Sequence, residues 1–176
     1  VHENVLAVKA DGPTKEDFAW GFRCGFLTFG CKGFSEAHYD ALLKKLMGII
    51  RSSVSCGATP SQTILLKAFK ESENNAEKEA LYKMLKTRYQ LVREFVDGRK
   101  SHALEALPFN SGYFMSFAVK GIDAETLRSR LLHESGIGTV SIDAETLRVA
   151  FSSIDEDAIH AVYEKIYDTA EALRRA

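Results

Sequence analysis

The chain has 176 residues, 45% hydrophobic and 27% charged, which is ordinary for a globular protein and enough for the core of one domain or one and a half. Its 23 basic and 24 acidic residues give a formal charge of −1, which argues against a nucleic-acid or membrane-surface partner. Cys24, Cys31 and Cys56 have no metal-ligand spacing, so we expect reduced thiols in a cytoplasmic protein without a metal site.

The first element along the chain is an apolar run at residues 5–10, which predicts a buried strand ended by the turn-forming residues 11–13. The run starts almost at the first residue, without an initiator Met, as is typical of a chain cut just before a buried strand. We therefore expect the sequence to be part of a longer chain. After a short polar and aromatic connection, residues 22–29 predict a second buried strand.

Three helices are expected in the middle of the chain. Residues 37–50 place apolar side chains on one helical face, behind Ser35 as a weak cap. Their apolar stretch is too short and too interrupted by charge to span a bilayer. A loop of small polar residues leads to a second helix, which starts at residue 60 or 61 and runs to residue 69. The third helix begins at residue 72, is long and highly charged, and ends at Gly98, which is typical of a connector between domains.

Strands and helices alternate in the last third of the chain. Strands are expected at residues 113–119, 138–142 and 146–151, and helices at residues 123–133 and 155–173. Ser153 or Asp155 is the expected cap of the last helix. The pattern is typical of a compact α/β unit with helices on one face of a small sheet.

One seven-residue sequence, Ile-Asp-Ala-Glu-Thr-Leu-Arg, occurs at residues 122–128 and again at residues 142–148. The first copy continues with residues that extend a helical period, whereas the second continues with Val-Ala-Phe and alternates like a strand. We therefore predict different secondary structures for the two copies, set by context rather than by local propensity. Two copies with unlike flanks do not make a repeat protein.

The residues that indicate chemistry lie between the first two predicted strands. Lys15 follows a strand and a tight turn, and Arg23 lies eight residues later, flanked by glycines. A partly desolvated lysine near another cation has a lowered pKa and can act as a neutral amine that forms an imine with a carbonyl. A guanidinium offers a planar fork for phosphate oxygens, and glycines permit close backbone approach. The pattern fits an anionic cofactor that carries a carbonyl group; Lys15 alone also fits an exposed lysine beside an ordinary strand.

This stretch resembles the cofactor-attachment motif of class I (fold type I) pyridoxal-phosphate-dependent aminotransferases. That motif places Gly, Arg and Gly six, eight and ten residues after the lysine, and all three match here, at Gly21, Arg23 and Gly25. The resemblance implies that Lys15 is the catalytic lysine that binds pyridoxal 5'-phosphate, and that Arg23 holds the phosphate.

The chain departs from the family at one position of this motif. The family often has a serine three residues before the lysine, and Gly12 stands there in this chain. Thr14, directly before Lys15, is expected to supply a hydroxyl to the cofactor instead.

A second stretch, residues 146–151, resembles the family segment whose arginine binds the α-carboxylate of the substrate. It is strand-like and precedes the final helix. A bidentate pair between Arg148 and a carboxylate orients an amino acid and rejects decarboxylated amines. Considered alone, Arg148 fits a surface arginine of a strand, and its position relative to Lys15 and the last helix favours the substrate role.

The order of the predicted elements resembles the family along essentially the whole chain. The resemblance implies an α/β fold in three parts: residues 1–71 as the end of the large cofactor-binding domain, residues 72–98 as an interdomain helix, and residues 99–176 as the small C-terminal α/β domain. Residues 110–114 also resemble the glycine-aromatic entry to that small domain, although a turn into a strand fits them equally well.

The resemblance implies transfer of an amino group between an L-amino acid, of the aspartate or aromatic type, and a 2-keto acid, by a protein that is a homodimer at full length. In the family the acidic partner of the cofactor's pyridine nitrogen lies upstream of the lysine, so we expect these 176 residues alone to be inactive. Two alternatives stay open. One is an aminotransferase-like effector domain of a transcription regulator, although no segment is basic enough to indicate DNA contact. The other is a degenerate homologue, against which Lys15, Arg23 and Arg148 together argue.

Overall fold

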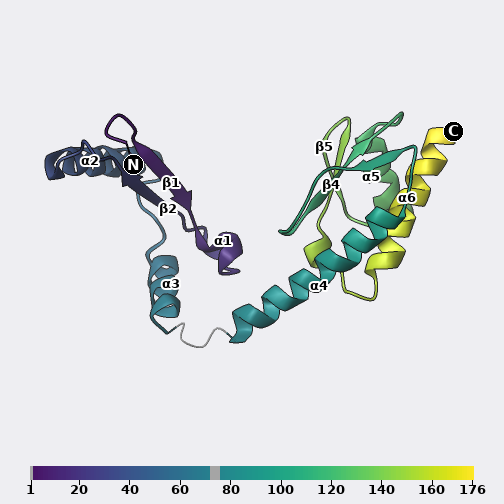
Figure 1. Ribbon diagram of the computed structural model, residues 1–176, viewed down its shortest axis with the longest axis horizontal. Helices are drawn as coiled ribbons and strands as arrows, with labels where there is room; N and C mark the ends of the chain where they lie inside the picture. The colour runs from purple at the N-terminus through teal and green to yellow at the C-terminus, as the bar shows by residue number, and fades with distance from the viewer. Residues whose placement is uncertain (1, 72–75) are drawn as a thin grey trace. The chain divides into compact units, whose positions relative to one another are not determined.

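A computed structural model describes residues 2–71 and 76–176 (Figure 1). The chain forms two compact units, an N-terminal unit (Val1–Lys78) and a C-terminal unit (Glu79–Ala176), and each is described by itself. Among the described residues, no helix is both long and apolar enough to cross a membrane.

The N-terminal unit is built around an antiparallel hairpin. Its elements are strand β1 (Ala7–Asp11), the one-turn helix α1 (Pro13–Glu16), the 3-10 helix η1 (Trp20–Phe22), strand β2 (Phe26–Gly30) and helices α2 (Glu36–Ser53) and α3 (Thr59–Glu71). Ala7 pairs with Gly30 at one end of the hairpin and Asp11 with Phe26 at the other. Both predicted strands are confirmed, but β2 starts four residues late. The left-handed backbone of Arg23, at φ 51°, interrupts the extended run that the apolar sequence predicts.

The predicted burial of these two strands is wrong for the described residues. β1 is exposed at every position before Asp11, and β2 is exposed until Phe29. Large apolar side chains of the hairpin stand open, with Val8 54% exposed and Leu27 56% exposed. Apolar composition predicts burial, but a two-stranded hairpin gains a buried face only where another layer covers it.

Helices α2 and α3 confirm the predicted helical segments. The backbone N–H of Ser35 donates to Nδ1 of His38 over 3.0 Å, which completes the predicted cap as a capping box. The apolar face of α2 is largely open, with Met47 68% exposed and Ile50 47% exposed, whereas Leu65 of α3 is buried. Among its described residues, the N-terminal unit therefore has little hydrophobic core of its own.

The C-terminal unit contains a four-stranded sheet. Helix α4 (Ala76–Gly98) contains the boundary between the units and is followed by β3 (Leu104–Ala106), β4 (Met115–Val119), α5 (Ala124–Ser135), β5 (Val140–Asp143), β6 (Thr146–Val149), η2 (Phe151–Ser153) and α6 (Ile159–Arg175). The strand order is β3-β4-β6-β5, and each neighbouring pair is antiparallel. Of the predicted helix at residues 72–98, residues 72–75 lie outside the described part of the chain. β3 was not predicted, because three residues are too few for a clear alternation.

One cluster of apolar side chains forms the core of the C-terminal unit. Alternate residues of β4, namely Met115, Phe117 and Val119, are buried, so one face of the sheet carries the core. The rings of Tyr163 and Tyr167 on α6 lie 6.3 and 5.4 Å from the ring of Phe117, between centroids. Figure 1 shows α5 and α6 beside the sheet. This is the compact α/β unit that the sequence predicts.

The predicted start of the last helix is wrong. α6 begins four residues late, with Ala158 at its N-cap and no side-chain cap, so neither Ser153 nor Asp155 caps it. Instead, Nη1 of Arg88 donates to the carbonyl of Ser152, and Arg88 also lies 3.5 Å from the carboxylate of Asp155. These contacts reach α4, far away in sequence, so no local pattern could report them.

The two copies of Ile-Asp-Ala-Glu-Thr-Leu-Arg adopt different structures, as predicted. In the first copy the carboxylate of Asp123 caps α5 by accepting from the N–H of Thr126 over 2.8 Å. In the second copy Asp143 ends β5, and its carboxylate accepts from the N–H of Glu145 over 2.9 Å in the hairpin turn. The same side chain therefore stabilises a helix start in one context and a tight turn in the other.

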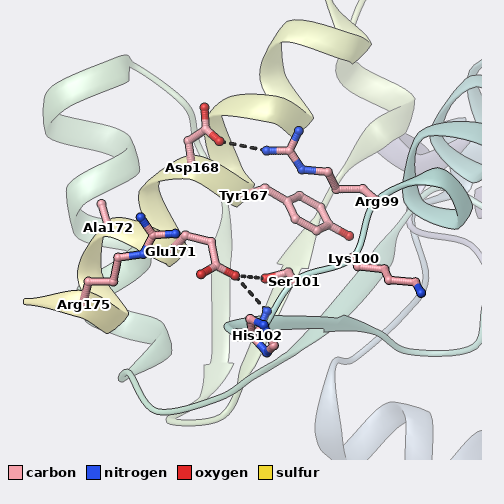
Figure 2. Close-up of a pocket in the computed structure, with 9 residues that line it drawn as sticks. All are labelled: Arg99, Lys100, Ser101, His102, Tyr167, Asp168, Glu171, Ala172 and Arg175. Carbon is pink, nitrogen blue, oxygen red and sulfur yellow. Dashed lines mark hydrogen bonds and ion pairs between the residues drawn. The ribbon is translucent and has the colours of Figure 1, made fainter.

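A carboxylate of α6 holds the segment that follows α4. Oε1 of Glu171 accepts from the hydroxyl of Ser101 over 2.6 Å and from the N–H groups of His102 and Ala103 over 2.8 and 3.2 Å; Figure 2 shows Glu171 directed at Ser101 and His102. The hydrogen bond from Ser101, followed by that from His102, lowers the pKa of Glu171 to about 2. The ordinary pKa of a glutamate is 4.5, so the ionised Glu171 stabilises the folded state. This contribution is complete above about pH 4.5 and is lost as the pH falls toward 2.

Replacing Glu171 by Gln is expected to lower the Tm of the C-terminal unit by about 5 °C at pH 7, because three hydrogen bonds lose their charged acceptor. The difference from wild type should shrink as the pH is lowered toward 2, where the wild-type carboxylate is itself protonated. Thermal unfolding followed by circular dichroism measures both effects. Glu156→Gln, at an exposed position before α6, is the control, and equal Tm values for E171Q and wild type at pH 7 would contradict the prediction.

Candidate functional site

Lys15 lies on α1, the single helical turn between β1 and β2. Pro13 is buried at the start of this turn, where the fixed φ angle of proline suits the first position of a helix. The turn ends where the N–H of Asp17 donates to the carbonyl of Pro13 over 3.2 Å. The side chain of Thr14 is half-buried and that of Lys15 is exposed. The expected partial desolvation of Lys15 is therefore wrong for the described residues, because the hairpin next to it is itself uncovered.

Arg23 stands where the chain turns back into β2. It ends η1 in a left-handed conformation, and its Nη1 donates to the carbonyl of Trp20 over 3.2 Å. Within the described part of the chain, no ion pair involves Arg23. Its guanidinium therefore carries a charge that no described carboxylate neutralises, as suits a group that binds an anion.

Gly12 stands where β1 approaches the chain entering β2. A Cβ atom at Gly12 would lie 3.0 Å from the carbonyl oxygen of Cys24, so a serine would require the backbone of one segment to move. The φ of Gly12 is 176°, an extended value open to any residue, so the reason for glycine is space. Gly12 permits this close approach, and Thr14 carries the hydroxyl nearest to Lys15 in sequence.

Arg23 also lines a cavity of about 520 Å³ within the N-terminal unit. Most of the remaining wall is apolar and comes from β2, α2 and α3, including Phe26, Leu65 and Phe69. Lys15 and Thr14 do not line it. The described residues therefore place Lys15 and Arg23 on the same short segment without gathering them into one cavity.

Arg148 lies on β6 in the C-terminal unit, opposite Ser116 of β4 and Val140 of β5. Its neighbours in sequence, Leu147 and Val149, are buried in the core, so Arg148 projects from the other face of the sheet. Its guanidinium carbon lies 4.8 Å from the ring centroid of Phe114. The side chain is half-buried.

The predicted site residues fall into two groups. Thr14, Lys15 and Arg23 belong to the N-terminal unit, and Arg148 belongs to the C-terminal unit. Sequence reasoning overlooked Phe114 as a contact of Arg148. Strand alternation places Phe114 on the face opposite the buried Met115 and Phe117, but it does not identify Arg148 as the neighbour on that face.

No protein-family model matches the sequence, and no curated protein matches it. Solved structures do match. A multiple substrate aminotransferase from Thermococcus profundus aligns with a TM-score of 0.75 at 18% identity, over 96% of this chain and 41% of that chain. An aminotransferase from Anaerococcus prevotii aligns with a TM-score of 0.74 at 23% identity, over 95% of this chain and 40% of that chain.

A third match carries a ligand in its crystal. It is the α-aminoadipate aminotransferase from Thermus thermophilus, complexed with N-(5'-phosphopyridoxyl)-L-leucine, with a TM-score of 0.67 at 18% identity over 88% of this chain and 39% of that chain. The chain thus spans about two-fifths of the length of the structures it matches. The likeness confirms the predicted α/β fold of the aminotransferase type.

Proposed function

We propose that this chain is the C-terminal part of a longer pyridoxal-phosphate-dependent aminotransferase, which moves an amino group between an L-amino acid and a 2-keto acid. The proposal is carried by Lys15 on a one-turn helix, with Arg23 eight residues later, in a chain whose fold matches solved aminotransferases. A fold alone hosts many activities, so the lysine and arginine carry the chemistry.

The proposal assigns a part to each segment. Residues 1–71 are the end of a cofactor-binding domain, the helix at residues 72–98 connects the domains, and residues 99–176 form the small domain. In support, the boundary between the two compact units falls within α4. The exposed apolar side chains of the hairpin, α2 and α3 fit contacts with the rest of a larger domain.

Residues of the N-terminal unit fit two ends of pyridoxal 5'-phosphate. The amine of Lys15 suits its aldehyde, and the guanidinium of Arg23 suits its phosphate, with the hydroxyl of Thr14 as a further donor. The acidic partner of its pyridine nitrogen is proposed to come from the remainder of the longer chain. When bound, the group supplies an electron sink for negative charge at the substrate Cα.

The chain's own residues would act as follows. The Lys15 amine would hold the cofactor through its aldehyde and, as a general base, would take the proton from the substrate Cα. Arg23 anchors the phosphate. Arg148 binds the α-carboxylate through two parallel hydrogen bonds, which orients the substrate and excludes amines that lack a carboxylate.

The substrate class and the assembly rest on the resemblance of the motif. We propose amino acids of the aspartate or aromatic type as substrates, with the longer protein acting as a homodimer.

The 176-residue chain alone is expected to show no transaminase activity with pyridoxal phosphate, whereas the longer protein is expected to be active. The reason is that the acidic partner of the cofactor's pyridine nitrogen is proposed to lie in the remainder of the longer chain. The assay is amino transfer from L-aspartate, L-tyrosine or L-phenylalanine to 2-oxoglutarate, with borohydride reduction and peptide mass spectrometry to find the labelled lysine. Label on a lysine other than Lys15 in the active longer protein would contradict the proposed function, and turnover by the short chain would contradict the predicted inactivity.

A further inference from the structure

An aromatic ring is the described partner of the Arg148 side chain. The guanidinium carbon lies 4.8 Å from the centroid of the Phe114 ring, within the range of a cation–π contact. Arg148 is half-buried, and Phe114 remains 39% exposed. The pair therefore forms a partly open platform on the C-terminal unit.

Strand register explains why these two side chains meet. Ser116 pairs directly with Arg148 across β4 and β6, and Phe114 lies two residues before Ser116 in sequence. The backbone pairing of these two segments extends beyond β4 and β6, since the N–H of Ser152 donates to the carbonyl of Tyr113 over 3.3 Å. Phe114 is thus a diagonal neighbour of Arg148 on the face opposite the core, within reach of a long side chain.

Arg148 differs from several other arginines of the C-terminal unit in its ion pairing. Several other arginines of the C-terminal unit lie within 4.0 Å of a carboxylate: Arg88, Arg93, Arg99, Arg128 and Arg130. Within the described residues, no ion pair involves Arg148, and its partners across the sheet, Ser116 and Val140, are uncharged. A carboxylate partner would compete with an anionic ligand, whereas a ring fixes the guanidinium plane and leaves its N–H donors available.

We propose that Phe114 is a positioning residue that holds the Arg148 guanidinium over its ring, so that the outer N–H donors face a carboxylate ligand. The proposal rests on the proposed function only in naming that ligand as the α-carboxylate of the amino acid or keto acid. Residues 110–114 fit a glycine-aromatic entry to the small domain and a turn into a strand equally well, and the proposal gives Phe114 among them a role in recognition.

The structural part of the proposal is tested in the 176-residue chain by NMR of the Arg148 Nε–Hε group. In Phe114→Leu the ring-current shift of this proton should disappear and its motion on the picosecond–nanosecond timescale should increase, whereas Phe114→Tyr should resemble wild type. Phe109→Leu is the matched control, because it removes a ring 5.2 Å from the guanidinium of Arg93. Unchanged Arg148 dynamics in Phe114→Leu would overturn the proposal.

The functional part is tested by kinetics of the longer protein. Phe114→Leu should raise KM for both the amino acid and the keto acid roughly threefold to tenfold, with a smaller effect on kcat and none on cofactor affinity. Phe114→Tyr should restore KM to near the wild-type value. An equal loss toward an amine without a carboxylate would overturn the role through Arg148. Altered Arg148 dynamics in a longer protein without any transaminase activity would instead refute the proposed function and leave the positioning role intact.

Discussion

Replacing Lys15 by alanine in the longer protein is expected to lower transaminase turnover by about 10³-fold or more, since the variant loses both the attachment group and the general base. Lys15→Arg should be equally inactive. Its guanidinium keeps the positive charge but stays protonated in proteins, so it cannot act as a neutral amine. Steady-state kinetics give the loss in kcat, and borohydride reduction should leave residue 15 without cofactor in both variants.

Lys32→Ala is the matched control, because Lys32 is an exposed lysine on the loop after β2 with no assigned role. It should keep the wild-type kcat. Since Lys15 is itself exposed on a one-turn helix, its replacement is not expected to unfold the chain, and thermal unfolding checks this. A Lys15→Ala variant that retained full activity would exclude Lys15 as the catalytic lysine.

Secondary structure was predictable where the flanking residues favoured one of the two structures, helix or strand, that a short segment could adopt. The seven-residue repeat is the sharpest case: residues 124–128 continue into α5, while residues 146–148 belong to β6. In both copies the leucine is fully buried, as Leu127 and Leu147. The flanks decide because the first copy continues with a helical apolar period, and the second continues with alternation that extends a sheet.

Burial and capping were less predictable, because both depend on contacts distant in sequence. The strands β1 and β2 are apolar yet exposed, so composition indicated a covering layer that the described residues of the N-terminal unit do not supply. The exposure of Lys15 has the same cause. At the other end of the chain, the carbonyl of Ser152 is bound by Arg88 of α4, a contact that no helix-start pattern could report.

The site was predictable at its charged residues and not at its aromatic one. Lys15, Arg23 and Arg148 follow from spacing and resemblance. Phe114 is placed by the register that sets Ser116 opposite Arg148, and a register becomes known only when the strands are paired.

Replacing Arg148 by leucine is expected to lower kcat/KM for amino acids by about 30-fold or more, the effect of removing one partner from a desolvated charge pair. Arg148→Lys should recover only part of this loss, because an ammonium cannot form two parallel hydrogen bonds with a carboxylate. The loss should appear mainly in KM if the pair forms in the ground state and persists in the transition state. Steady-state kinetics with a saturating keto acid measure it.

The repeat supplies the matched control for this experiment. Arg128 is the same residue of the first copy, but it lies on α5, where its Nη2 is 2.5 Å from the carboxylate of Glu125. Arg128→Leu removes an exposed ion pair and should leave kcat/KM unchanged. Selectivity then separates a binding role from a structural one: Arg148→Leu should lose activity with an amino acid but not with the corresponding decarboxylated amine, so the preference for the carboxylate collapses. An Arg148→Leu variant that lost activity toward both compounds equally would show that Arg148 stabilises the fold rather than binding the carboxylate.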